Sequence, residues 1–229
     1  MLKKVINGII IAISVLLIGF VMIFSMLPNC VLNASTTIGG FSIPIIIIVI
    51  TMIVEIKRTT DLQEKSKIQD FWLKILFIIY CLLLITILFL NNEYRRVGFQ
   101  DISVFSKEHF EISNFIPFVT LIEYINRTIE HSINISIVIL NVMTNLFLFA
   151  PMGFFIPILF KDKITNLKQF IILIVIITLI VEILQFVTYR GATDVDDIIL
   201  NTIGAVIVYI LMKTKLVKKI LEKTFDISE

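Results

Sequence analysis

The sequence predicts an all-α membrane protein, a polytopic bundle of six transmembrane helices. Hydrophobic residues make up 58% of the 229 residues, and the mean hydropathy is +0.99. Soluble domains contain about 45–50% apolar residues. The apolar residues gather in six runs, each near the roughly 20 residues that a helix needs to cross a hydrocarbon core. A soluble helical bundle is disfavoured, because these segments leave nothing from which to build a water-facing surface.

The six runs give the predicted spans. They are Val5–Leu27, Ile38–Ile56, Phe71–Leu90, Ile135–Phe160, Phe170–Thr188 and Val195–Met212. The first is expected to stay uncleaved, because it exceeds the roughly 7–15 apolar residues of a signal peptide. The last is the shortest, at about 27 Å as a helix, so its ends must thin the bilayer or pack within the bundle.

The basic residues are unevenly divided between the two sides. With six spans, fifteen of the 20 Lys and Arg residues fall on the side of the termini, and five on the other. The positive-inside rule therefore predicts that both termini are cytoplasmic. The net charge is only +2, and no basic cluster lies outside the span flanks, so the sequence gives no case for nucleic acid.

Three regions are predicted along the chain. Residues 1–56 form a two-span hairpin, residues 71–212 form the core, and residues 213–229 form a basic cytoplasmic tail. The charged connector from Lys57 to Asp70 separates the hairpin from the core.

The outer loop between Asn91 and Asn134 is predicted to contain a helix that starts near Pro117, since proline is tolerated in a first turn. Apolar residues then recur on one face, and polar residues fall on the other. The apolar set is Phe118, Leu121, Ile122, Ile125 and Ile129, and the polar set is Glu123, Asn126, Arg127 and Glu130. This pattern suits a helix lying in the membrane interface, and an ordinary packed loop helix is the alternative.

Polar side chains within the last three spans are the candidate functional residues. Such residues usually face a protein interior or a water-filled cavity and often mark function. The set is Asn141, Asn145, Glu182, Gln185, Arg190, Asp194, Asp196, Asp197 and Asn201. Under the predicted orientation, they all fall in the outer half of the membrane, with Arg190 and Asp194 at the outer opening of the site.

Asn141 and Asn145 share one face of the fourth span, because they are four residues apart. Below them, Pro151 removes a helical hydrogen bond and is expected to kink the helix. Hydrogen bonding between helices is the favoured role for the two asparagines.

Glu182 and Gln185 share one face of the fifth span, and Arg190 follows eight residues after Glu182. A direct pair between Glu182 and Arg190 would need the chain to turn back at Gly191. A functional site is favoured here. The alternative is a buried ion pair or hydrogen bond that only holds the helices in register.

The sixth span opens with three acidic residues. Thr193 and Asp196 have the spacing of a capping box, and acidic groups suit the positive end of the helix dipole. Three acids exceed what a cap requires, and Asp197 shares a face with Asn201, near the small Gly204. No cofactor is predicted: the aspartates could hold a divalent cation, but no His or Cys supports a transition-metal site.

Four segments together carry a family resemblance. They are Asn114-Phe115-Ile116-Pro117-Phe118, Asn145-x-Phe147-x-Phe149-x-Pro151-x-Gly153, Glu182-x-x-Gln185 and Arg190-x-x-x-Asp194-x-Asp196-Asp197-x-x-x-Asn201-x-x-Gly204. With this order and spacing, the chain from about Phe71 to Met212 resembles the VanZ-like family. The resemblance implies a four-span core, which makes residues 1–56 an added hairpin. VanZ itself is associated with low-level teicoplanin resistance, so the likeness also implies an envelope role in the cell membrane of a Gram-positive bacterium. The family has no settled reaction.

Three functions are open. The first is binding or shielding of an amphiphile, such as a membrane lipid, a lipid-linked envelope molecule or a lipoglycopeptide, in an outer polar cavity. The second is an intramembrane enzyme that uses Glu182 as an acid or base. The third, a small transporter, is weakened because the polar set stops short of the cytoplasmic half. The sequence does not identify a protein partner.

Overall fold

The computed structural model describes residues 2–27, 34–90, 113–188, 193–215 and 217. Within these residues, every regular element is helical. Six segments are long and apolar enough to cross a membrane, which confirms the six predicted spans. They are Val5–Met26, Ser35–Arg58, Leu62–Leu90, Ile135–Leu159, Leu167–Val187 and Val195–Met212. The chain is a multi-pass membrane protein.

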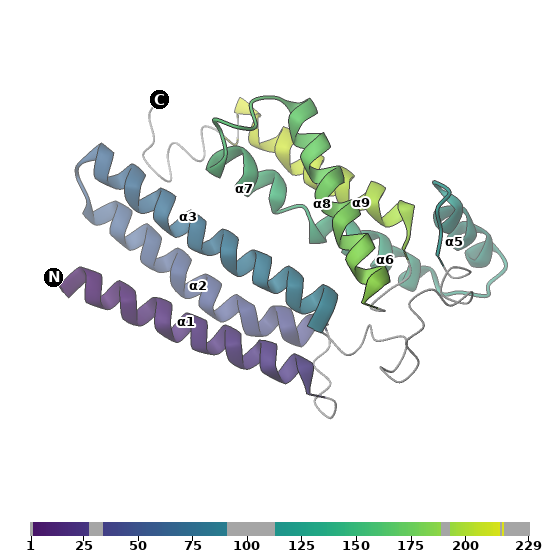
Figure 1. The fold of residues 1–229 in the computed structure, drawn as a ribbon, viewed down its shortest axis with the longest axis horizontal. Coiled ribbons are helices and arrows are strands. Elements are labelled where there is room, and N and C mark those ends of the chain that lie inside the picture. The colour runs from purple at the N-terminus through teal and green to yellow at the C-terminus, as the bar shows by residue number, and fades with distance from the viewer. Residues whose placement is uncertain (1, 28–33, 91–112, 189–192, 216, 218–229) are drawn as a thin grey trace. The chain divides into compact units, whose positions relative to one another are not determined.

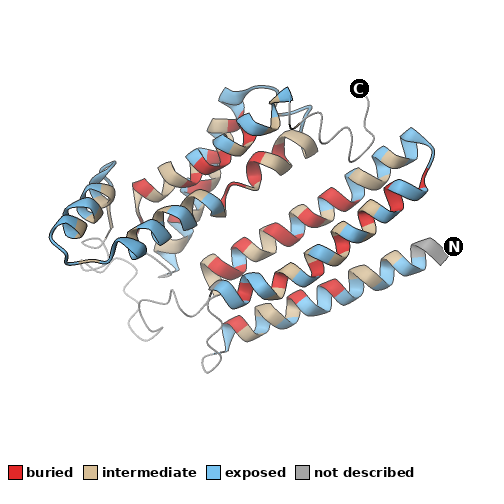
Figure 2. Ribbon diagram, turned by 180° about the vertical axis from the view of Figure 1, so that it is seen from behind, coloured by how far each residue is buried: buried red, intermediate tan, exposed pale blue. Residues whose placement is uncertain are grey.

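The first compact unit contains α1 (Leu2–Met26), α2 (Ala34–Arg58) and α3 (Leu62–Ile85), which run side by side in Figure 1. The third span ends in a π-helical turn, η1 (Thr86–Leu90). The core of the first unit is formed by fully buried aromatic and aliphatic side chains such as Phe41, Ile48 and Trp72. The faces turned away from this core are apolar and exposed, as expected for helices solvated by lipid (Figure 2).

A buried carboxylate joins the three helices of the first unit. Glu55 on α2 accepts a hydrogen bond from the side-chain amide of Asn7 on α1 at 2.9 Å and from the indole N–H of Trp72 on α3 at 2.6 Å. Glu55 is only 7% exposed. A buried carboxylate needs such donors to offset its lost hydration, so this contact fixes the register of the three helices.

The second compact unit contains α5 (Val119–Ile129), α6 (Ile135–Leu148), α7 (Met152–Leu159), α8 (Leu167–Val187) and α9 (Val195–Met212). The units divide after Arg95, so α3 packs with α2 in the first unit. The predicted division of the sequence into residues 1–56, 71–212 and 213–229 stays a prediction. Within the second unit, α9 is the hub, because α5, α6, α7 and α8 all pack against it.

The fourth span is broken rather than bent. The expected kink at Pro151 is a full interruption: α6 ends at Leu148, a turn covers Phe149 to Pro151, and α7 begins at Met152. Proline lacks the N–H that would continue the hydrogen-bond ladder. The turn is closed by the Met152 and Gly153 amides, which donate to the Phe149 and Ala150 carbonyls at 3.0 and 2.9 Å.

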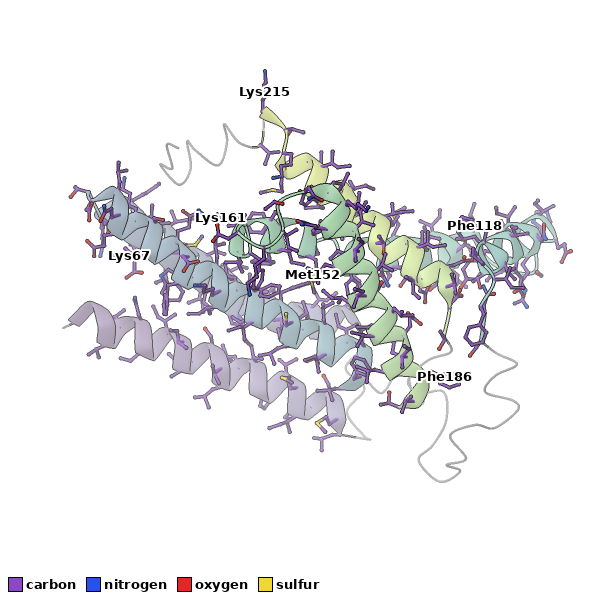
Figure 3. The ribbon with its side chains drawn as sticks, turned by 45° about the horizontal axis from the view of Figure 1, so that its top comes forward. Lys67, Phe118, Met152, Lys161, Phe186 and Lys215 are labelled. Atoms are coloured by element: carbon purple, nitrogen blue, oxygen red, sulfur yellow. The ribbon has the colours of Figure 1, made fainter. Side chains whose placement is uncertain are left out.

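Two glycines allow both halves of the broken span to approach α9 closely. A Cβ atom added at Gly204 would collide with the backbone of Leu146 on α6. One added at Gly153 would collide with the Ala205 carbonyl and the Tyr209 amide nitrogen on α9. Small residues at helix crossings permit this separation in membranes. Met152, labelled in Figure 3, is buried beside this crossing.

The uneven distribution of basic residues predicts which loops face the cytoplasm. In a variant with Cys30 and Cys81 replaced by serine, Glu123→Cys on α5 is expected to react with an impermeant thiol reagent in intact cells. Asp162→Cys and Lys67→Cys are expected to react only after permeabilisation, because they lie on the basic side. All three side chains are exposed, so access to the reagent depends on the side of the membrane. The opposite labelling pattern would reverse the orientation.

Candidate functional site

The segment that precedes α5 is bound to the segment that precedes α9. The Asn114 amide donates to the Thr193 carbonyl at 2.8 Å, and the Val195 amide donates to the Asn114 carbonyl at 3.0 Å. These two bonds form an isolated parallel β-bridge between Asn114 and Asp194. The Asn114 side chain also accepts from the Ile116 amide at 3.0 Å, which holds the turn that leads to Pro117.

Asp194 is the N-cap of α9. Its carboxylate accepts from the Asp196 amide at 2.9 Å, from the Asn114 side-chain amide at 3.2 Å and from the Thr120 hydroxyl at 2.7 Å. The capping box expected from Thr193 and Asp196 is therefore wrong, because the cap begins one residue later and takes its acceptor from Asp194.

Asp196 caps a different helix. Its side chain, only 1% exposed, accepts from the Phe118 amide at 2.5 Å and from the Leu121 amide at 3.1 Å, both at the start of α5. Phe118 adopts a left-handed backbone conformation with φ of 69° and provides no side-chain cap of its own. Free N–H groups at a helix start need acceptors, and here a carboxylate from α9 supplies them.

The two asparagines of α6 point to different partners. Asn145 donates a hydrogen bond from its side-chain amide to the Asp197 carboxylate in the first turn of α9. Asn141, one turn earlier, donates to the Tyr124 hydroxyl on α5 at 3.2 Å. Both contacts join helices, as expected for polar residues in a membrane bundle.

Glu182 lies at the same end of the bundle. It is 3% exposed, and its carboxyl group accepts from the Asp194 amide at 3.2 Å. Asp197 and Asp194 are close enough for their charges to act on it. Gln185 is half-buried and makes no side-chain hydrogen bond to a described residue. Arg190 lies outside the described residues, so its predicted place at the mouth stays a prediction.

Asn201 lies one helical turn after Asp197 on α9. Its side chain is 4% exposed, and its Oδ1 atom is buried without a hydrogen-bond partner among the described residues. Residues four apart share a helix face, so this acceptor extends the polar face that begins at Asp197. Gly204, the next small residue on that side, brings α6 close.

Sequence reasoning missed the hydroxyl groups of α5. Thr120 binds Asp194, and Tyr124 accepts from Asn141. A signal was present: Thr120, Tyr124 and Thr128 recur every four residues and so form one edge of the helix. Patterns of apolar and charged residues alone do not reveal such an edge.

Seven of the predicted polar residues thus fall into two groups; Asn141 and Gln185 belong to neither, and Arg190 lies outside the described residues. Asn114, Asp194 and Asp196 form a latch, here meaning the contacts that fasten α5 to α9. Asn145, Glu182, Asp197 and Asn201 form the polar cluster, which extends from the start of α9 into the bundle. The described residues contain no group of three or more His, Cys, Asp and Glu side chains arranged to hold a metal ion. The polar cluster offers carboxylate and amide oxygens, which accept hydrogen bonds from hydroxyl or amine groups.

Comparison with known proteins identifies the family. The sequence model described as VanZ/LLP1 matches residues 77–218, more than half of the chain. The match covers the latch, the polar cluster and the broken fourth span. No curated protein and no solved structure matches the chain.

Proposed function

The chain belongs to the VanZ/LLP1 family, and on this premise we propose that it binds or shields an amphiphilic molecule of the bacterial cell envelope. The ligand has a polar head and an apolar tail, as a phospholipid, a lipid-linked envelope precursor or a teicoplanin-type lipoglycopeptide does. The polar cluster would hold the head group in the outer half of the membrane. The proposed location is the cell membrane of a Gram-positive bacterium.

The unpartnered acceptor of Asn201 carries this proposal. A buried polar group without a partner costs about 1–3 kcal/mol, so a ligand that donates a hydrogen bond there would recover that cost. Hydroxyl and amine groups of a head group are such donors. Glu182 adds a buried carboxyl group that accepts a single hydrogen bond from the described residues.

The depth of the polar cluster supports an amphiphilic ligand. Among the described residues of the second unit, Glu182 and Asn201 are the buried charged or amide side chains that reach deepest. Thr178, one turn before Glu182 on α8, donates a hydrogen bond to the Ile174 carbonyl at 3.0 Å. Apolar side chains, such as Phe170 and Ile174, fill the region beyond. This distribution suits a head and a tail, and it disfavours a transport path, which would need polar groups in both halves.

An intramembrane enzyme is the second candidate, and the burial of Glu182 favours it. A carboxyl group in a water-poor site beside other acids has the setting of a general acid or base. The two candidates differ in their products. Binding or shielding leaves the amphiphile unchanged, whereas an enzyme changes its mass.

Replacing either acid of the polar cluster with its amide is expected to abolish the protection against teicoplanin that the proposed function implies, while the protein stays in the membrane. Glu182→Gln keeps the shape of the side chain and an oxygen that can accept from the Asp194 amide. Asp197→Asn keeps the size of the side chain, and the Asn145 amide can turn to pair with it. The measurement is growth in graded teicoplanin of a host that produces each variant, with membrane levels followed by immunoblot. Glu123→Gln, which removes an exposed acid on α5, is the matched control and should behave as the unchanged protein.

The outcomes separate the alternatives. Full protection by the Asp197→Asn variant would contradict the proposed site. A loss of protection that tracks a loss of protein in the membrane would assign Glu182 and Asp197 to structure alone. A new mass in extracted envelope lipids or in the drug, absent from the Glu182→Gln strain, would favour the enzyme.

A further inference from the structure

Helix α5 has three distinct faces. At about 100° per residue, Thr120, Tyr124 and Thr128 fall on one edge of the helix. The apolar residues Phe118, Leu121, Ile122, Ile125 and Ile129 fall on the next face. The charged and amide residues Glu123, Asn126, Arg127 and Glu130 fall on the third.

The hydroxyl edge is the face that meets the rest of the second unit. Thr120 donates to Asp194 at 2.7 Å, and Tyr124 accepts from Asn141 at 3.2 Å. The half-buried residues of α5 are those of this edge together with the adjoining Leu121, and every other residue of the helix is exposed. The helix is therefore held by hydrogen bonds rather than by its apolar face.

The apolar face of α5 is left uncovered. Ile122, Ile125 and Ile129 are 54%, 58% and 70% exposed. Phe118, labelled in Figure 3, adds another large exposed side chain at the start of the helix, at 54%. Water is a poor environment for such a face, because exposed apolar surface is unfavourable to hydrate.

The position of α5 in the chain identifies what covers this face. The Asp196 carboxylate fastens the start of α5 to the first turn of one membrane span. The end of α5 leads through Asn134, the N-cap of α6, into another span. A helix tied at both ends to the ends of spans lies at the membrane boundary. Glu123 and Arg127, paired at 2.6 Å, belong on the aqueous side because charged groups are costly to remove from water.

From this geometry, we propose that α5 lies along the bilayer surface as an interfacial helix, with its apolar face against lipid acyl chains. Its hydroxyl edge faces the bundle sideways, and its charged face meets the water. Amphipathic helices bury such faces about 5–10 Å into the boundary between head groups and acyl chains. The latch at Asp194 and Asp196 sets the depth and the rotation of the helix.

Spin labels on the two faces test this proposal. In a full-length protein with Cys30 and Cys81 replaced by serine, single cysteines are introduced at Ile125 and Ile129 on the apolar face. Matched controls are introduced at Asn126 and Glu130 on the charged face. All four positions are exposed, so each accepts a label. The protein is placed in vesicles of phosphatidylethanolamine and phosphatidylglycerol, and collisions with oxygen and with a water-soluble nickel complex are measured.

Labels at Ile125 and Ile129 are expected to collide more with oxygen than with nickel, and the order is expected to reverse at Asn126 and Glu130. Nickel access on both faces would overturn the proposal and make α5 a solvated loop helix. Exclusion of both reagents at Ile125, with dipolar broadening between labels, would overturn it in favour of contact with a second copy of the chain. In an Asp196→Ala background, loss of the difference in reagent preference between the two faces would show that the latch orients the helix. Persistence of that difference would overturn this role of the latch.

Discussion

The Gly204→Ala variant is expected to lose much of the stability of the second unit. The added methyl group would meet the carbonyl oxygen, carbonyl carbon and Cα of Leu146, and backbone atoms cannot move aside as a flexible side chain does. Overpacking typically costs about 1–3 kcal/mol and occasionally more. The cost falls on the crossing of α6 and α9, which also places Asn145 beside Asp197. We therefore expect a lower melting temperature of the purified protein in detergent.

Gly19→Ala on α1 is the matched control, because a Cβ atom there meets nothing within 4 Å. Alanine favours a helix over glycine by up to about 1 kcal/mol, so this control should melt at the same temperature or slightly higher. Equal melting of the Gly204→Ala variant and the unchanged protein would mean that α6 and α9 are further apart than the structure places them.

The Asp196→Ala variant is expected to release α5 from α9. Hydrogen bonds to a charged group contribute about 1.5–3 kcal/mol each, and this carboxylate accepts from the amides of both Phe118 and Leu121. The measurement is hydrogen exchange across residues 113–130, where faster uptake reports loss of the cap. The exchange rate of the Asp196→Asn variant should lie between those of the unchanged protein and the Asp196→Ala variant. The asparagine keeps one acceptor and turns an NH₂ group toward the other donor.

Asp61→Ala provides the comparison for this release. Asp61 also accepts from two backbone amides, those of Gln63 and Glu64, but both belong to its own helix. Removing an ordinary cap costs about 1 kcal/mol and should leave exchange across α5 unchanged. Unaltered exchange in the Asp196→Ala variant would contradict the capping of α5 by α9.

The spans could be predicted from the sequence because they depend on a local quantity, the number of consecutive apolar residues. The helix after Pro117 could be predicted for the same reason, from the periodicity of Ile122, Ile125 and Ile129. The break at Pro151 was only partly predictable. Proline removes one hydrogen bond and so indicates a bend, but whether the chain bends or stops depends on the contacts that α9 makes on both sides.

The roles of the aspartates could not be predicted, because they depend on contacts distant in sequence. Asp196 follows a threonine at capping distance, which favours a local role. Its acceptors instead serve amides 78 and 75 residues away. The pairing of Asn145 with Asp197 is likewise invisible to helical spacing within one span. Spacing identifies which residues share a face, and only the packing of helices identifies which faces meet.

The central place of α9 has a consequence for how the protein is made. Ribosomes complete chains from the N-terminus, so α5, α6, α7 and α8 all leave the ribosome before the helix that they pack against. Neither half of the broken span can cross the membrane by itself: α6 has 14 residues and α7 has 8, or about 21 and 12 Å of helix. Asn145 and Glu182 also enter the membrane before their partners are made. These partners are the Asp197 carboxylate on α9 and the Asp194 amide at its start. Biogenesis of the second unit therefore ends with a single late event, the arrival of the sixth span, which closes the bundle and completes its polar contacts together.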